Sequence, residues 1–191
     1  VITTATDANN LPAIDMIAKE SGCRIEAPEN IKRVNMVILK GGVIRVYDPG
    51  KFILPAFKKS YSQAHCQEDL AGSDIYCSYK IHSVPRETLV LRPPVLCVGI
   101  GCNRNTTSEQ IRNFLLSVLD RTNLAEGSIA SLATSDVKKD EKGLLEFAGE
   151  MRLPISFYDK KALNSVKGVP NPSAMAEKHL GVTSVSEAAA I

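Results

Sequence analysis

The chain has 191 residues, of which 44% are hydrophobic and 23% charged, a composition typical of a globular protein with a substantial core. Its 23 basic residues exceed the 21 acidic ones so slightly that we expect no nucleic-acid-binding surface. The sequence contains no run of about 18 apolar residues, which argues against a membrane span.

The cysteines, the histidines and the first residue indicate the compartment, the absence of a metal site and the place of this chain in a longer protein. Five cysteines, an odd number with no CxxC pair, favour a reducing compartment, and we expect a cytoplasmic protein. The three histidines are scattered without ligand spacing, so we expect no protein-bound metal. Val1 is not a start methionine and no signal-peptide pattern follows it, which predicts that the chain begins inside a longer protein.

Residues 1–92 are predicted to form a smaller α+β domain. A β-branched run at residues 1–4 leads into a turn at residues 9–12. We then expect helices over residues 12–22 and 27–40, and strands over residues 43–47, 75–81 and 88–91. Apolar residues alternate through the second of these strands, which predicts one buried face. Residues 52–74 have no clear period and stay unassigned.

Residues 92–94 read Arg-Pro-Pro and mark the predicted boundary to a second domain over residues 93–191, because two prolines stiffen a connection and cannot extend a ladder. From Val95 onward, strand and helix patterns alternate. We expect strands over residues 95–100, 129–133 and 154–158, and helices over residues 107–121, 139–150, 160–166, 172–180 and 184–191. Repeated βα units predict a three-layer α/β/α domain with a mostly parallel sheet.

The sequence predicts the burial of one strand and the N-terminal cap of one helix in this domain. Residues 95–100 are almost continuously apolar, which predicts a strand buried on both faces. In the following helix, Thr107 and Gln110 predict a capping box. The apolar residues on one side of that helix are Ile111, Phe114, Leu115, Val118 and Leu119.

The loop between this strand and helix is the first candidate site. A helix start leaves N–H groups unpaired and carries partial positive charge, so it favours an anion. Gly99 and Gly101 let the backbone approach such an anion, and Arg104 adds a bidentate carboxylate contact. A tight turn whose glycines only satisfy geometry fits equally well. Arg104 also replaces the third glycine of a dinucleotide fingerprint, so a nucleotide-binding domain is the weaker alternative.

Parallel strands bring residues 101–106, 134–139 and 157–160 to one rim, where ligands of such sheets bind. Asp136 and Lys138, beside the hydroxyl of Thr134, can position a water or a substrate carboxylate. The alternative, favoured on the residues alone, is that Thr134 or Asp136 caps the next helix and Lys138 is solvated.

Two further positions belong to the same group of candidates. The turn over residues 170–173, with Asn171 and Ser173, forms either a helix entry or a wall of the site. Cys102 precedes a helix start, which lowers a thiol pKa, but cysteine nucleophiles need a base and the loops hold no histidine. A small buried or turn cysteine is therefore the better interpretation.

Ordered motifs now carry a resemblance to a known family. Residues 99–102, 132–138 with 140–141 and 143–144, 170–173 and 185–190 together resemble the C-terminal domain of the cobalamin biosynthesis protein CbiG. Residues 3–15 and 28–35 resemble the family's central region, so the resemblance covers nearly the whole chain. The family is the cobalt-precorrin-5A hydrolase of the anaerobic pathway, and the C-terminal domain is shared with CobE of the aerobic pathway.

The resemblance implies hydrolytic opening of the ring-A δ-lactone of cobalt-precorrin-5A, with release of acetaldehyde, to give cobalt-precorrin-5B. The substrate is an anionic cobalt corrinoid, and because it carries the cobalt itself no cofactor is implied. The implied partners are an N-terminal domain and corrin-pathway methyltransferases, and the family's final strands are expected to be missing here. A non-catalytic corrinoid-binding module is the alternative.

Roles for the candidate residues follow from the resemblance. Lactone opening needs a base, for which Asp136 is the candidate with Lys138 beside it, and donors for the oxyanion, for which the backbone at Gly101 and Cys102 is the candidate. The substrate-binding residues are expected to be Gly99, Gly101, Cys102, Asn103, Arg104, Thr134, Asn171 and Ser173.

Overall fold

The computed structural model describes residues 11–191, apart from the side chain of His179. The expected run at residues 1–4 and the start of the turn at residues 9–12 lie outside the described residues. The chain divides into two compact units. The first comprises Val1–Pro94 with Asn123–Ser128, and the second comprises Val95–Thr122 with Ile129–Ile191.

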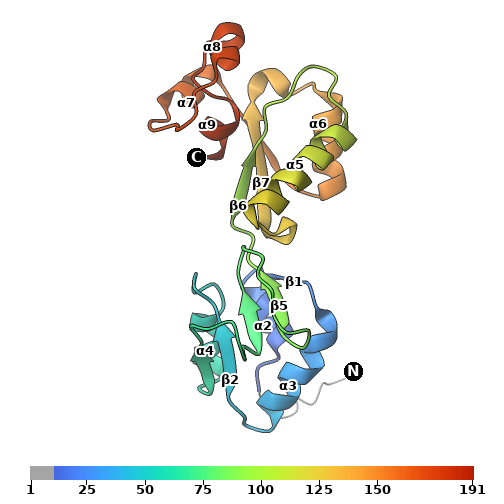
Figure 1. The fold of residues 1–191 in the computed structure, drawn as a ribbon, viewed down its shortest axis with the longest axis vertical. Helices are drawn as coiled ribbons and strands as arrows, with labels where there is room; N and C mark the ends of the chain where they lie inside the picture. Colours follow the sequence, from blue (N-terminus) through green and yellow to red (C-terminus); the bar gives the residue numbers. More distant parts are fainter. Residues whose placement is uncertain (1–10) are drawn as a thin grey trace. The chain divides into compact units, whose positions relative to one another are not determined.

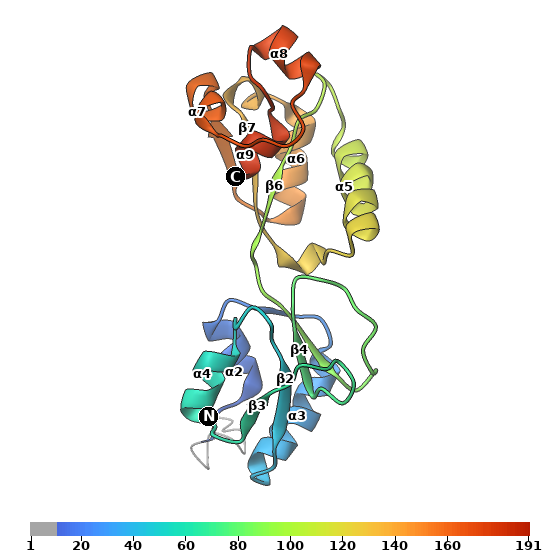
Figure 2. The ribbon, with the colours of Figure 1, turned by 60° about the vertical axis from the view of Figure 1, so that its left-hand side comes forward.

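The first unit is built on a five-stranded mixed sheet (Figure 2). Its strands, in the spatial order β1-β5-β4-β2-β3, are β1 Arg24–Ile25, β5 Leu89–Arg92, β4 Ile75–Cys77, β2 Ile44–Tyr47 and β3 Ala64–Cys66. Neighbouring strands pair in parallel except β1 with β5. The helices are α2 Ile14–Glu20, the 3-10 turn η1 Pro28–Asn30, α3 Ile31–Leu39 and α4 Leu54–Ser60.

Both expected helices of the first unit are confirmed, because their apolar spacing places one stripe on the sheet. The helix α2 buries Ile14, Ile17 and Ala18, and α3 buries Val34 and Ile38. Residues 52–74, which the sequence left unassigned, hold α4 and β3.

The start of α4 depends on a side chain that lies outside the helix. The carboxylate of Asp48, itself buried, accepts hydrogen bonds from the backbone N–H groups of Phe52, Ile53 and Leu54, each at 2.9 Å. These donors would otherwise be unpaired at a helix start. Sequence spacing does not show this cap, since capping patterns place the acceptor closer to the helix.

The expected strand over residues 75–81 is wrong in length and in burial pattern. The structure has only β4 Ile75–Cys77, in which all three residues are buried, and Ile81 is 46% exposed. The strand β4 lies between β2 and β5 in the middle of the sheet, so both of its faces are covered and no alternation survives. Beyond it the chain turns, and the hydroxyl of Tyr76 donates to the carbonyl of Lys80 at 2.6 Å.

The second unit has a parallel sheet in the order β6-β7-β8, formed by β6 Leu96–Gly99, β7 Ile129–Ser135 and β8 Ile155–Tyr158. Its helices are α5 Ser108–Thr122, α6 Lys142–Met151, α7 Lys160–Ser165, α8 Ala174–Leu180 and α9 Ser186–Ala190, with the 3-10 turn η3 Asp136–Lys138 after β7. Within this unit, α5 and α6 lie on one side of the sheet and α7 and α9 on the other (Figure 1). The expected α/β class and parallel sheet are confirmed.

Between α5 and β7 the chain returns to the first unit. This segment, Asn123–Ser128, includes the 3-10 turn η2 Glu126–Ser128. The N–H of Ile81 donates to the carbonyl of Asn123, and the N–H of Ala125 donates to the carbonyl of Tyr79, both at 2.8 Å. A segment of six residues is too short to carry a period, so its sequence does not indicate this return.

Two expectations for the second unit are corrected and one is confirmed. The strand β6 is an edge strand with Cys97 exposed, so it is not buried on both faces. Phe114, expected on the apolar side of α5, is 69% exposed. The capping box is present: the N–H of Thr107 donates to Gln110 Oε1 at 3.0 Å, and the N–H of Gln110 donates to Thr107 Oγ1 at 3.2 Å. Across residues 11–191, we find no helix with the length and apolar character needed to cross a bilayer.

Candidate functional site

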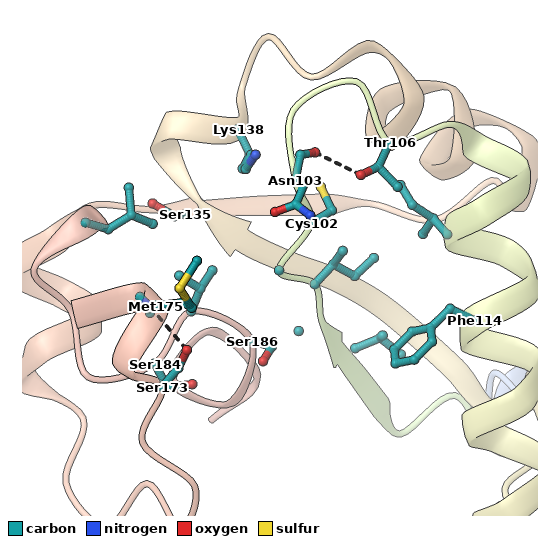
Figure 3. Close-up of a pocket in the computed structure, with 18 of the residues that line it drawn as sticks. Cys102, Asn103, Thr106, Phe114, Ser135, Lys138, Ser173, Met175, Ser184 and Ser186 are labelled. Atoms are coloured by element: carbon teal, nitrogen blue, oxygen red, sulfur yellow. Dashed lines mark hydrogen bonds between the residues drawn. The ribbon is translucent and has the colours of Figure 1, made fainter. Parts of the chain in front are cut away.

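A cavity of about 980 Å³ opens in the second unit, where β6 ends (Figure 3). Five parts of the chain line it: the end of β6 with the loop after it, one side of α5, the region after β7, the start of α8 and the turn before α9. The expected convergence of loops at the carboxyl ends of the strands is therefore present for β6 and β7, whereas residues 157–160 after β8 do not line it.

The cavity has an apolar floor and a polar rim. Ile111 and Leu115 of α5, together with Ile100, are buried and form part of the floor. The rim carries uncharged donors and acceptors and two cations. These residues are Asn103, Arg104, Thr106, Gln110, Ser135, Lys138, Ser173, Ser184 and Ser186.

The two glycines of the first candidate loop have different reasons to be glycine. A Cβ on Gly99 would lie 1.7 Å from the carbonyl oxygen of Ser186, so α9 packs directly on the backbone of β6 at this point. A Cβ on Gly101 would have its nearest neighbour, the Cβ of Val185, at 3.9 Å. Gly99 is therefore required by packing, which agrees with the alternative that the glycines of this turn only satisfy geometry. Gly101 faces open space in the cavity.

Beyond the end of β6, Gly101, Cys102 and Asn103 line the cavity. The N–H of Ile100 still donates to the carbonyl of Ala133 at 2.8 Å. For the N–H groups of Gly101, Cys102 and Asn103, the described part of the chain supplies no hydrogen-bond acceptor. Successive unpaired N–H groups at the edge of a cavity are suited to bind an anionic oxygen.

A buried carboxylate shapes the loop around these donors. Glu141 is 4% exposed, and its Oε1 accepts the N–H of Asn105 at 2.7 Å. Its Oε2 lies 3.6 Å from Lys138 Nζ and 3.6 Å from Arg104 Nη1. Asn105 has a φ of +63°, a conformation that asparagine tolerates better than most residues. Glu141 thus fixes the loop and holds the ammonium of Lys138 at the cavity.

Arg104 reaches the cavity but is already paired. Its Nη1 contacts Asp140 Oδ1 at 2.6 Å and its Nη2 donates to the carbonyl of Val137 at 3.2 Å. Both side chains of the Arg104–Asp140 pair are exposed, so this ion pair is weak and exchangeable. A ligand carboxylate at Arg104 competes with Asp140 for the same guanidinium.

Thr134 and Asp136, two further predicted site residues at and just after the end of β7, do not line the cavity. Thr134 is fully buried, and its hydroxyl donates to the carbonyl of Ile100 at 2.7 Å, so it fastens β7 to the end of β6. Asp136 begins η3 and is half-buried, but it does not line the cavity, although Ser135 and Val137 on either side of it do.

The turn over residues 170–173 lines one side of the cavity with Ser173 and is bound to α9 through Asn171. The backbone N–H and the amide of Asn171 donate to the two carboxylate oxygens of Glu187 at 2.9 and 2.6 Å, so Asn171 ties the turn to α9 and does not line the cavity. Ser173 does line the cavity, and its Oγ accepts the N–H of Ala176 at 3.2 Å as the cap of α8. Helix entry and site wall are both present here.

Cys102 lines the cavity without the features of a nucleophile. Burial raises the pKa of the Cys102 thiol, and the opposing effect of the Lys138 and Arg104 cations does not offset it. A thiol whose pKa is raised stays protonated near neutral pH and is a poor nucleophile.

Several cavity residues escaped sequence reasoning. Phe114 and Met175 were assigned to helices, and no pattern marked them as lining a site. Ser184 lies in the turn before α9 and Ser186 is the first residue of α9, positions where small polar residues are common for reasons of local structure. Of these residues, only Phe114 could have indicated the site from the sequence. It widens the apolar stripe of α5 beyond what a single packing partner covers.

The family models match both units. Residues 96–191 match the family described as "Cobalamin synthesis G C-terminus", and residues 12–93 match "Cobalamin biosynthesis central region". The expected resemblance is confirmed by these two matches.

Curated relatives extend the match to the whole chain. A cobalt-precorrin-5A hydrolase of Priestia megaterium is 30% identical over 100% of this chain and 54% of its own length. The enzyme of the same name from Salmonella typhimurium is 25% identical over 100% of this chain and 56% of its own length. The chain therefore spans about half the length of these relatives. The protein CobE of a Sinorhizobium species is 29% identical over 50% of this chain and 63% of its own length.

Solved structures give weaker likenesses. The crystal structure of CobE has 34% sequence identity and a TM-score of 0.48, covering 51% of this chain and 69% of its own. A putative cobalamin biosynthesis protein G homologue from Sulfolobus solfataricus has 19% identity and a TM-score of 0.40, covering 93% of this chain and 51% of its own. Both scores fall below 0.5, so relationship is judged from the sequence matches.

Proposed function

The chain belongs to the CbiG family of cobalamin biosynthesis proteins, and from this premise we propose that the protein is a cobalt-precorrin-5A hydrolase whose corrinoid substrate binds in the cavity of the second unit. The observation that carries the proposal is the cavity itself. It combines an apolar floor, unpaired N–H groups and the cation of Lys138, and a corrinoid combines an apolar ring with many carboxylates.

The proposed reaction is hydrolytic opening of the ring-A δ-lactone. A water oxygen adds to the lactone carbonyl carbon, a base takes the water proton, and the carbonyl oxygen gains negative charge that donors must stabilise. Opening breaks the acyl C–O bond and leaves a carboxylate on ring A and a hydroxyl on the two-carbon unit. That hydroxyl then loses its proton and becomes the aldehyde C=O, while the C–C bond to the macrocycle breaks and its electron pair, with a proton, stays on the ring, so the unit departs as acetaldehyde. The N–H groups of Gly101 and Cys102 are the proposed donors for the oxyanion, and Lys138 is the proposed cation beside them.

Asp136 is the proposed base, and a substitution at this residue tests the role because the side chain lies next to the cavity lining but outside it. It lies between Ser135 and Val137, which line the cavity, but its own side chain is not part of the lining. Asp136→Asn is expected to lower acetaldehyde release at least 100-fold while corrinoid binding stays unchanged, since removing a general base typically costs about 10²–10⁴ in rate. Unchanged turnover would assign the base to another residue.

The deciding experiment measures acetaldehyde released from cobalt-precorrin-5A by a protein that carries this chain together with its upstream sequence. Acetaldehyde is detected by a coupled alcohol dehydrogenase, and lactone loss is followed by mass. We expect one acetaldehyde per lactone opened. If no acetaldehyde forms although substrate binds, the hydrolase proposal fails.

A second proposal is a non-catalytic corrinoid-binding module, which is favoured by the match between half of this chain and CobE. In this case the cavity binds and protects an intermediate without changing it. Binding of cobalt-precorrin-5A with recovery of the intact lactone after long incubation would support the module. The same titration with Lys138→Gln is expected to show weaker binding under either proposal, because both need a cation at the rim.

A further inference from the structure

Two large apolar side chains stand exposed at the cavity. Phe114 is 69% exposed and Met175 is 65% exposed, and of the large apolar side chains in the described ranges only that of the last residue, Ile191, is more exposed, at 77%. Both Phe114 and Met175 line the cavity. Large apolar side chains left in water at one concave site mark a surface that an apolar partner covers.

The two side chains come from separate elements. Phe114 projects from α5 and Met175 from α8, and Figure 3 shows them on opposite sides of the cavity. Each helix has its own local N-terminal cap: the N–H of Ala176 donates to Ser173 Oγ in α8, and the N–H of Gln110 donates to Thr107 Oγ1 in α5. The cavity therefore has two apolar walls with space between them.

The sequence of α5 explains why Phe114 is not covered by the protein. Ile111, Leu115 and Leu119 form one stripe that is buried. Phe114, three residues after Ile111, and Val118, four residues after Phe114, lie on the neighbouring stripe, and both line the cavity. Ile111 and Leu115 are buried at the floor of the cavity, whereas Phe114 on the adjoining stripe stays exposed, so α5 leaves one large apolar side chain uncovered at this site.

The charges around the cavity select the kind of ligand. Lys138 lies 3.6 Å from Glu141, and Arg104 is paired with Asp140, so each cation already faces a carboxylate. Because each cation already faces a carboxylate, the rim carries little net positive charge, which does not favour the concentrated negative charge of a triphosphate. The volume of about 980 Å³ is at the upper end of the range for small-molecule sites, about 300–1,000 Å³.

We propose that Phe114 and Met175 form an apolar clamp that packs against the conjugated ring of a tetrapyrrole macrocycle, while its peripheral carboxylates reach the rim. The proposal rests on the proposed function and names the residues that select a ring over an acyclic polycarboxylate. An aromatic ring and a thioether both pack favourably on a flat conjugated surface. The clamp is a specificity device and takes no part in proton transfer.

The test is an absorbance titration of the whole chain with cobyrinic acid, a corrin whose carboxylates are free. Phe114→Ala and Met175→Ala are each expected to weaken binding at least about fivefold, since an aromatic or thioether contact contributes about 1 kcal/mol and the lost apolar area adds to it. Phe114→Leu is expected to recover part of the loss because it restores apolar area. Both side chains are exposed, so these changes leave the fold intact.

The matched control is Leu116→Ala. Leu116 lies on the same helix, is 37% exposed and does not line the cavity, so its truncation is expected to leave the affinity unchanged. Citrate, an acyclic tricarboxylate, is the comparison ligand, and its weak binding is expected to be equal in Phe114→Ala and in the unchanged chain. A loss of affinity for citrate as large as that for cobyrinic acid would overturn the clamp.

The outcomes separate the clamp from the hydrolase. Cobyrinic acid affinity that depends on both side chains, with no acetaldehyde from cobalt-precorrin-5A, supports the clamp and removes the hydrolase. Acetaldehyde release with the same KM in Phe114→Ala and Met175→Ala supports the hydrolase and removes the clamp. Unchanged cobyrinic acid affinity in both variants overturns the clamp whatever the turnover.

Discussion

The two units place their apolar side chains differently. The first unit gathers its buried residues from α2, α3, α4 and the sheet in one continuous cluster. The second unit buries one stripe of α5 and leaves Phe114 and Met175 exposed around a cavity. The difference is that the second unit leaves large apolar side chains uncovered at a concave surface, which is the feature on which the proposed ligand site depends.

Buried charge follows the same division. In the first unit, the carboxylate of Asp48 accepts three backbone N–H groups, and Asp74 is paired with Arg33 and Arg45. In the second unit, Glu141 has one oxygen at 3.6 Å from two cations that also face the cavity rim. Charges of the first unit are satisfied within the fold, whereas those of the second remain open to exchange.

The largest expected effect is a loss of stability caused by disturbing the packing of the second unit. Gly99→Ala places a Cβ against the carbonyl of Ser186 and is expected to destabilise the second unit by about 3 kcal/mol or more, because backbone of α9 cannot move away cheaply. Gly101→Ala, two residues away, is expected to cost about 1 kcal/mol or less, since its nearest neighbour is at 3.9 Å. Urea unfolding midpoints measure both, and equal midpoints would contradict the packing argument.

The next effect concerns the satisfied charge of the first unit. Burial alone would raise the pKa of Asp74, but hydrogen bonds from the backbone and guanidinium of Arg45 and from Arg33 outweigh it and hold the pKa below its usual value. A depressed pKa in the folded state contributes stability above the unfolded value of about 4, and this stability is lost as pH falls through the folded pKa. Unfolding midpoints at pH 7 and pH 3 are expected to show the loss.

Asp74→Asn provides the comparison for that measurement. It is expected to lower stability by about 1–2 kcal/mol at pH 7 and to flatten the dependence on acid pH, since an amide does not titrate there. A variant that loses as much stability between pH 7 and pH 3 as the unchanged chain would show that other carboxylates carry the acid sensitivity.

A smaller effect tests whether rim charges are open to exchange. Asp140→Asn frees the guanidinium of Arg104, and binding of cobyrinic acid is expected to tighten about two- to threefold at low salt and to return toward the original affinity at high salt. Glu146→Gln removes the same charge from an exposed position of α6 and serves as the control. Equal tightening in both variants would assign the effect to net charge.

The smallest expected effect is none. Because burial raises the pKa of Cys102, Cys102→Ser is expected to leave corrinoid binding and acetaldehyde release unchanged. Alkylation by iodoacetamide is expected to be slower at Cys102 than at the exposed Cys97. Loss of turnover in Cys102→Ser with binding retained would reopen a nucleophilic role.

Local patterns predicted the helices and the parallel strands of the second unit because each depends on residues close in sequence. The capping box of Thr107 and Gln110 is of this kind, as is the stripe of Ile14 and Ile17 in α2 of the first unit. The length of β4 was mispredicted because its burial is set by neighbouring strands, which periodicity does not encode. The same limit hid α4, whose cap lies six residues before Leu54.

The candidate site shows the same limit. The loop after β6 was found from its glycines and Arg104, and it does line the cavity. The sequence could not show that Glu141 reaches Asn105 across 36 residues, or that Gly99 is required by α9. Phe114 was placed on the apolar side of its helix because periodicity groups apolar residues without showing which of them the protein covers.

The return of Asn123–Ser128 to the first unit means that the polypeptide passes from one unit to the other three times. A protease nick after Pro94 therefore cuts only one of three covalent passages, and the two products are expected to co-elute in size-exclusion chromatography. A gene truncation that starts at Val95 would retain this segment without the carbonyl of Tyr79 that pairs with Ala125. Genetic dissection of the protein has to replace or excise residues 123–128 together with the first unit.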